Sequence, residues 1–114
     1  VTFFENYSET IKILKKNIFN LNCEKKTKII TKDIFNIKNL SKFYKEKFEI
    51  IFLDPPYKEK KLTILLKHIL DLKLLKKDGI IIIHRHKQED EHYPEKFNIL
   101  QIKNYGISKI IFGN

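Results

Sequence analysis

The stretch Asp54-Pro55-Pro56-Tyr57 combines residue types that suit the chemistry of an amino group. Each proline fixes φ at about −65° and lacks an N–H. We therefore expect the two prolines to stiffen the loop and to leave its carbonyls without neighbouring donors. An ionised Asp54 is an acceptor only, so its carboxylate and one carbonyl form two acceptors that suit both hydrogens of an exocyclic –NH2 group. Tyr57 adds a flat ring on which a base can stack, an interaction worth about 1–3 kcal/mol.

An amino group conjugated to a base ring is a poor nucleophile because its lone pair is delocalised. Holding both hydrogens and tilting the group toward tetrahedral geometry frees the lone pair for a methyl donor, so catalysis would consist mainly of positioning and electrostatics. Asp54 need not be a strong base, because the amine becomes acidic only as it is alkylated. The plainer alternative is that the prolines merely end a strand and that Tyr57 packs on it.

The elements that position this loop are predicted from apolar spacing and turn residues. Helical spacing covers residues 8–22, with Ser8 as N-cap, and residues 59–79, which Lys76, Lys77 and Gly79 would close. A short helix or turn is expected at 36–47, and a hairpin around Asn104-Tyr105-Gly106 within 97–113. The strands expected before that hairpin are 1–5, 27–33, 48–54 and 80–84, the last of which reads as covered on both faces.

Alternating strands and helices favour one domain with an open α/β sheet of βαβ units, to which the terminal hairpin adds an antiparallel edge. In such sheets ligands bind beyond the carboxyl ends of the strands. Glu5, Asp33 and Asp54 each close an expected strand. Any one of them alone is best explained as a helix cap or solvated loop acid. Three at successive strand ends favour a functional site.

The net charge of +9 favours a polyanionic partner such as a nucleic acid. Lysine makes up 22 of the 23 basic residues, and isoleucine, asparagine and phenylalanine are also abundant. These residues have AT-rich codons, so a nucleotide bias would explain much of the same charge without any selection for binding.

The compartment is predicted from what the sequence lacks. A single cysteine, Cys23, excludes an internal disulfide and fits a reducing compartment. No apolar run is long enough to cross a bilayer, and the sequence shows no signal peptide. We expect a cytoplasmic protein with no membrane partner. The chain begins at Val1 and has no methionine, so we also expect it to be the C-terminal part of a longer chain.

The motif and its surroundings resemble a known family of methyltransferases. A sequence (Asp/Asn/Ser)-Pro-Pro-(Tyr/Phe/Trp) after the fourth strand resembles the amino-methylating S-adenosylmethionine-dependent enzymes. The order FFEN, LKKNIFNLN, KDIFN, FEIIFLDPPY, KKDGIIII and NYGISKIIFG is similar to that of RsmD-type 16S rRNA (guanine-N2-)-methyltransferases. The resemblance implies a Rossmann-like fold with strands 2–7, mostly parallel with a C-terminal antiparallel hairpin. It also implies methylation of a guanine (966-type position) in the small-subunit RNA, with 16S rRNA or the small ribosomal subunit as partner.

The resemblance also implies roles for individual residues. The catalytic loop is Asp54, Pro55, Pro56 and Tyr57. Cofactor contacts to S-adenosyl-L-methionine fall on Glu5 with Asn6, at the ribose hydroxyls, and on Asp33 with Ile34, near the adenine. RNA contacts are expected at Tyr57 and at four basic residues: Lys58, Lys60, Lys61 and Arg85.

One part of the family pattern is absent from this sequence. The glycines are Gly79, Gly106 and Gly113, so residues 1–114 contain no Gly-x-Gly and no first strand. The family's strand order is 3-2-1-4-5-7-6, and without strand 1 the strands 2 and 4 lose their shared neighbour. Either strand 1 lies in an N-terminal segment outside this sequence, which we favour, or strands 2 and 4 close up.

Three alternatives stay open at this point. His84 and His86, with His92 nearby, would fit a metal site, but we expect loop residues that point to opposite sides, and no metal. A DNA adenine-N6 methyltransferase uses the same motif, although it usually needs a target-recognition region. The third alternative is a catalytically silent methyltransferase-like fragment or partner subunit.

Overall fold

The computed structural model describes residues 1–114, which form two compact units, Val1–Asn39 and Leu40–Asn114. None of the helices has the length and apolar character that a membrane crossing requires.

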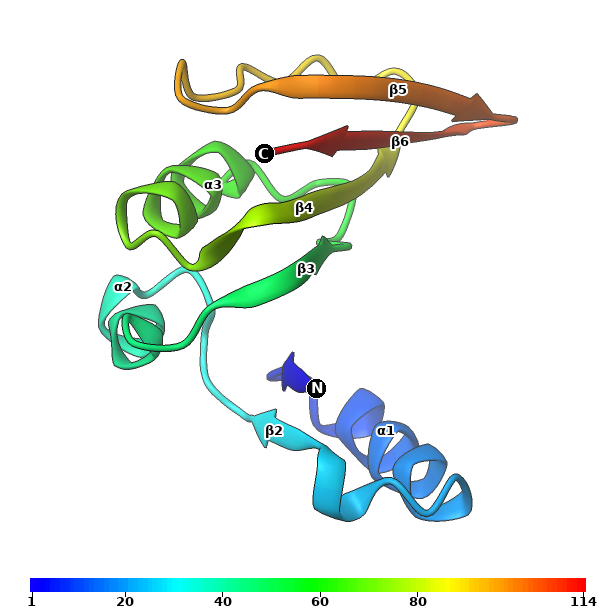
Figure 1. Cartoon of the computed structure of the whole chain (residues 1–114). Coiled ribbons are helices and arrows are strands. Elements are labelled where there is room, and N and C mark those ends of the chain that lie inside the picture. Colours follow the sequence, from blue (N-terminus) through cyan, green and yellow to red (C-terminus); the bar gives the residue numbers. More distant parts are fainter. The chain divides into compact units, whose positions relative to one another are not determined.

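The first unit contains two short strands and one long helix (Figure 1). Strand β1 (Thr2–Phe4) pairs in parallel with β2 (Lys28–Ile30), and α1 (Ser8–Asn20) with the 3-10 turn η1 (Glu24–Lys26) connects them. The expectation that Ser8 caps α1 is wrong, because Ser8 is already helical and the N-cap is Tyr7, without a side-chain hydrogen bond. The helix ends where Asn22 takes φ 52°.

The second unit is a four-stranded sheet in the order β3-β4-β6-β5 (Figure 1). Before it come the short helix α2 (Ile37–Leu40), which begins in the first unit, and η2 (Ser41–Phe43). Strand β3 (Phe48–Leu53) runs parallel to β4 (Leu75–His86), whereas β6 (Ser108–Gly113) is antiparallel to both β4 and β5 (Ile99–Tyr105). Gly106, at φ 55°, makes the β5–β6 turn, so the predicted hairpin is confirmed.

The core of the second unit lies on one face of the sheet, where α3 (Leu62–Asp71) follows the β3 loop. Alternate side chains of β4 are buried, and the residues between them, such as Ile80 and Ile82, are half-buried. The expectation that this strand is covered on both faces is therefore wrong for the described chain. The fully buried apolar residues come from α3 and from two strands, β4 and β6: Leu62, Leu65, Leu66, Ile69, Ile81, Ile83 and Ile111.

The predicted end of the second helix is wrong. Helix α3 stops at Asp71, and Lys73 at φ 51° lets the amides of Lys73 and Leu74 bond back to Leu70 O (3.0 Å) and Ile69 O (3.1 Å). Lys76, Lys77 and Gly79 belong to β4 instead. The apolar residues next to them continue the helical spacing, but this segment pairs with β3 and is therefore part of the sheet.

The strand order supports the expected fold class. In the numbering of the resembled family, β1 to β6 correspond to strands 2 to 7. Without strand 1, the family order 3-2-1-4-5-7-6 leaves two pieces, 3-2 and 4-5-7-6. The structure has β2-β1 in one sheet and β3-β4-β6-β5 in the other. Strands β1 and β3 belong to different sheets.

Candidate functional site

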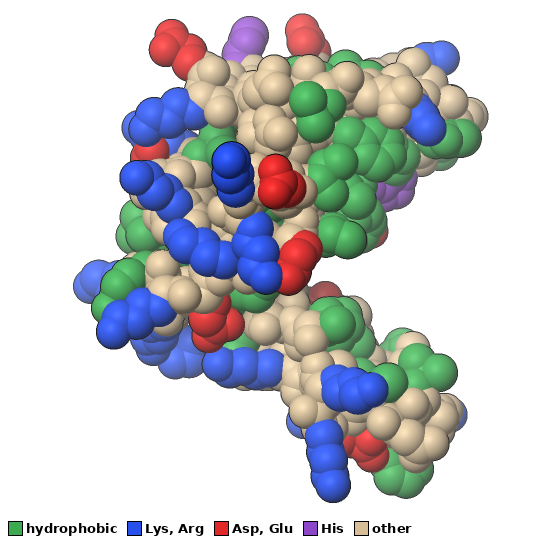
Figure 2. All heavy atoms as spheres, viewed as in Figure 1, with side chains coloured by type: hydrophobic (Ala, Val, Ile, Leu, Met, Phe, Trp, Pro, Cys, Tyr) green, Lys and Arg blue, Asp and Glu red, His purple; other side chains and the backbone are tan.

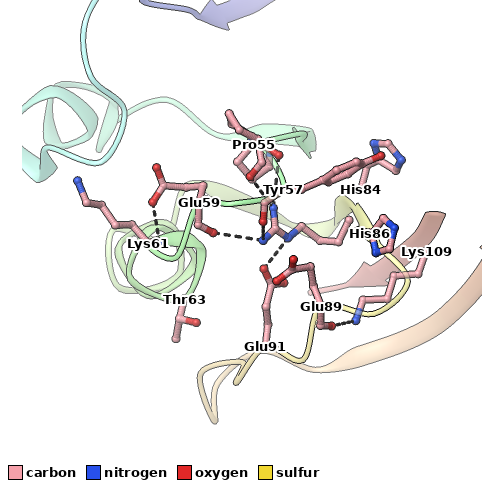
Figure 3. A network of polar contacts seen from close by, with 12 residues as sticks. Pro55, Tyr57, Glu59, Lys61, Thr63, His84, His86, Glu89, Glu91 and Lys109 are labelled. Carbon is pink, nitrogen blue, oxygen red and sulfur yellow. Dashed lines mark hydrogen bonds and ion pairs between the residues drawn. The ribbon is translucent and has the colours of Figure 1, made fainter. Parts of the chain in front are cut away.

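Asp54 lies beyond the carboxyl end of β3, next to the end of β4 (Figure 3 shows this region). Leu53 pairs with Ile83 in parallel register, so the next residues, Asp54 and His84, are neighbours. Their contact is a hydrogen bond of 2.8 Å between His84 Nδ1 and Asp54 Oδ1. The Asp54 side chain is 54% exposed, so its carboxylate is fixed at one oxygen and open to a ligand at the other.

The ring of Tyr57 is held by two histidine rings. It meets His84 at 6.0 Å between centroids and His86 at 5.4 Å, both in edge-to-face geometry. Tyr57 is still 39% exposed, so part of the ring can take a stacked base. His84 and His86 are the site residues that sequence reasoning missed.

The interpretation of these histidines as loop residues on opposite sides is wrong. Both belong to β4, and residues two apart on a strand share a face. Their continuity with the isoleucine run 80–83 was the signal that could have placed them. No group of three or more metal-binding side chains occurs in the described chain.

Arg85 lies beneath the loop and not on the RNA-accessible surface. It is 1% exposed, and it donates from Nη1 and Nη2 to backbone carbonyls of the loop (Figure 3). Two expectations are therefore wrong: Arg85 cannot contact RNA from this position, and the loop carbonyls are not free of donors. Both errors have one cause, because β4 continues to His86 and turns the side chain of Arg85 inward.

The lysines Lys58, Lys60 and Lys61 lead from the motif into α3, and all three are exposed. The amide of Lys61 donates to Glu59 Oε1 at 2.8 Å, which fixes the start of the helix. Their contact with RNA stays a prediction.

The four expected cofactor residues all lie in the first unit. Because β1 and β2 are parallel and Phe4 pairs with Ile30, Glu5 and Asn6 leave the same sheet edge as the segment that leads to Asp33 and Ile34. Glu5 Oε1 accepts the amide of Tyr7 at 2.8 Å, and Asp33 Oδ1 accepts the amide of Phe35 at 2.9 Å. Each acid thus has a local structural role.

The hydrogen-bond acceptors and the apolar surface of the first unit fit the ribose and adenine of a nucleoside cofactor. Each carboxylate uses one oxygen in its turn, which leaves the other as an acceptor for hydroxyl or amino hydrogens. Ile34 is half-buried beside Asp33 and offers an apolar surface to a flat ring.

The sequence profile described as "Conserved hypothetical protein 95" matches residues 1–114. The chain belongs to this family. The resemblance to RsmD-type proteins that the motifs predicted is thereby confirmed.

A curated relative from Bacillus subtilis, "Putative rRNA methyltransferase YlbH", is 31% identical over 111 residues, 95% of this chain. The chain spans 59% of the length of that relative.

Two solved structures share the fold. The "putative methylase HI0767" from Haemophilus influenzae has a TM-score of 0.76 at 24% identity, covering 99% of this chain and 70% of the other. The SAH-bound methyltransferase PaMTH1 of Podospora anserina has a TM-score of 0.74 at 14% identity, covering 98% and 59%. At these identities the likeness concerns the fold, which is an α/β arrangement found in methyltransferases.

Proposed function

We propose that the protein is an S-adenosylmethionine-dependent methyltransferase that modifies the exocyclic N2 amine of a guanine in 16S rRNA, at the 966-type position. The observation that carries this proposal is the Asp54–Tyr57 loop at the end of β3, with an open carboxylate oxygen beside a partly exposed ring. The rRNA-directed name of the Bacillus subtilis relative supports the substrate class.

Each residue of the loop has a separate role in activating the amine. Asp54 Oδ1 is fixed by His84, so Oδ2 can accept one N–H of the target in a defined direction. The Pro55 carbonyl receives only a long contact of 3.4 Å from Arg85, so it is the loop carbonyl best able to accept the second N–H. Tyr57 carries the base on its exposed part, and its histidine neighbours keep the ring in place.

S-adenosylmethionine, when bound, supplies an electrophilic methyl group. Held at both hydrogens, the amine directs its lone pair away from Asp54 and Pro55. As the nitrogen is alkylated its proton becomes acidic, and the Asp54 carboxylate is in place to hold it.

In this proposal four residues of the first unit hold the cofactor. Glu5, next to Asn6, accepts the ribose hydroxyls, and Asp33 accepts the adenine amino group with Ile34 against the ring. Residues 1–114 contain no Gly-x-Gly for the methionine end of the cofactor. Methyl transfer is therefore to be measured with the full-length gene product.

The proposed partner is the 16S rRNA or the small ribosomal subunit, met in the cytoplasm. Exposed lysines occur on each of the two units, and many of them are visible in Figure 2. Lys58, Lys60 and Lys61 adjoin the catalytic loop and are the nearest candidates for phosphate contacts.

The test is methyl transfer by the wild type and two Asp54 variants, with labelled S-adenosylmethionine and either 30S particles, free 16S rRNA or DNA. Asp54→Ala should abolish transfer and leave cofactor affinity within about tenfold, because the carboxylate grips the target amine. Asp54→Asn is the matched control, since its amide oxygen keeps an acceptor in place, and it should retain part of the activity.

Three outcomes would contradict the proposal. Label in DNA alone would replace it by adenine-N6 methylation. No label in any substrate would favour a silent methyltransferase-like protein. A large loss of cofactor affinity in Asp54→Ala with unchanged turnover would remove the assigned role of Asp54.

A further inference from the structure

Arg85 is the only arginine among 23 basic residues, and it is buried at 1% exposure. Charged side chains are almost never fully buried unless they are paired. In a chain whose exposed cations are all lysines, the one planar guanidinium lies directly beneath the Asp54–Tyr57 loop.

The guanidinium of Arg85 lies against four backbone carbonyls and one carboxylate (Figure 3). Nη1 lies 2.9 Å from Pro56 O and 3.4 Å from Pro55 O, while Nη2 lies 3.0 Å from Tyr57 O and 3.2 Å from Glu59 O. Nε lies 2.5 Å from Glu91 Oε1, in the geometry of an ion pair and not of an aligned hydrogen bond. Nη1 and Nη2 therefore donate to four carbonyls of residues 55–59, and Nε is neutralised by Glu91 without a hydrogen bond of its own.

The prolines explain why the loop needs this side chain. Pro55 and Pro56 have no N–H, so the loop cannot satisfy its carbonyls by a regular backbone ladder, apart from the bond of Glu59 N to Pro56 O at 2.9 Å. A lysine ammonium is a point charge with three donors, and it cannot serve four separated carbonyls and a carboxylate.

Glu91, which lies in the polar segment between β4 and β5, neutralises the buried charge of Arg85. Its side chain is 12% exposed, and its Oε2 accepts the hydroxyl of Tyr93 at 3.4 Å. Burial, together with the neighbouring Glu91 charge, raises the pKa of Tyr93 to about 12, so this hydroxyl keeps its proton at neutral pH.

We propose that Arg85, neutralised by Glu91, is a positioning residue that holds the Asp54–Tyr57 loop by its carbonyls in the geometry required for methyl transfer. The expected effect on methyl transfer rests on the proposed function, whereas the expected effect on the loop structure does not. Arg85 touches neither target nor cofactor in this role. It sets the places from which Asp54, the Pro55 carbonyl and the ring of Tyr57 act.

The experiment uses Arg85→Lys in the full-length gene product, with amide hydrogen exchange and steady-state kinetics as readouts. The amides of Tyr57, Lys58 and Glu59 should exchange about tenfold faster while those of Ile81 to Ile83 stay unchanged. The kcat for RNA methylation should fall about 30-fold with the cofactor Kd within about threefold, because misplacement of the loop affects the chemical step.

Ile81→Val is the matched control, since Ile81 is fully buried on the same face of β4 and touches none of the loop carbonyls through a hydrogen bond. It should lower stability without changing loop exchange or kcat. Glu91→Gln is the second variant in case Arg85→Lys does not fold: it removes the neutralising charge, keeps an acceptor, and should show the same pattern more weakly.

The proposal is overturned if loop and core amides accelerate together in Arg85→Lys, or if kcat is unchanged while the loop loosens. Hydrogen exchange needs no substrate. A wild type that transfers no methyl group would therefore contradict the proposed function alone, and the exchange data would still decide whether Arg85 holds the loop.

Discussion

At the scale of single residues, the loop after β3 takes its geometry from the next strand. His84 binds the Asp54 carboxylate at 2.8 Å, and His84 with His86 flanks the ring of Tyr57. These contacts leave one carboxylate oxygen and part of the ring accessible. The groups that remain open are the ones that an amine and a base would use.

Tyr57 gives a prediction at this scale. Tyr57→Ala should raise the KM for RNA by about 5- to 100-fold, since stacking on an aromatic face is worth about 1–3 kcal/mol per base. Tyr57→Phe keeps the face and should stay within about twofold of the wild type. The measurement is the KM for 16S rRNA or 30S particles. An equal loss in both variants would show that the hydroxyl and not the ring face matters.

At the scale of elements, both longer helices end through a non-glycine residue at positive φ. Asn22 after α1 has φ 52°, and its amide bonds to Phe19 O at 3.0 Å; Lys73 after α3 has φ 51° and bonds to Leu70 O at 3.0 Å. This conformation is unfavourable for residues with a Cβ, and less so for asparagine. The turn at Lys73 directs the chain into β4, and through β4 it fixes where His84 and Arg85 lie.

Lys73→Gly should therefore stabilise the protein by about 0.5–1 kcal/mol, because glycine adopts the left-handed conformation without steric cost. The carbonyl of Lys73, which accepts Lys47 Nζ, is retained in the variant. Asn22→Gly is the matched comparison and should gain less. Urea unfolding with an unchanged m-value measures both changes. A lower midpoint for Lys73→Gly would contradict the assigned helix end.

At the scale of the whole molecule, the charge of +9 is carried by exposed lysines on both units. Coding bias and RNA binding make different predictions for these lysines. If coding bias explains the charge, all exposed lysines should contribute about equally to RNA binding. If the charge serves catalysis, the lysines near the Asp54–Tyr57 loop should contribute most.

Changing Lys58 and Lys60 to glutamine should reduce the slope of log affinity against log salt by about one per lysine, as phosphate contacts do. The matched control is Lys42 with Lys45, both exposed residues that precede the amino end of β3, away from the loop. RNA binding measured between about 50 and 200 mM salt gives both slopes. Equal slopes for the two double variants would favour the compositional explanation.

The sequence by itself determined which segments form strands, the terminal hairpin and the Asp54–Tyr57 loop. These features depend on local chemistry: apolar runs, prolines that stop a strand, and a glycine at φ 55° in the turn. The end of α3 was not predictable in the same way, because leucines at helical spacing continue to Leu74 and the strand begins one residue later.

Only the tertiary structure decided what surrounds the loop. The parallel register of β3 and β4 places His84 beside Asp54, and alternation along β4 turns Arg85 inward to the loop carbonyls. Nothing in the letters His-Arg-His separates a surface loop from the end of a strand. The difference is that a loop with two prolines has few N–H donors of its own, and the fold brings the donors of Arg85 to its carbonyls from 30 residues further along the chain.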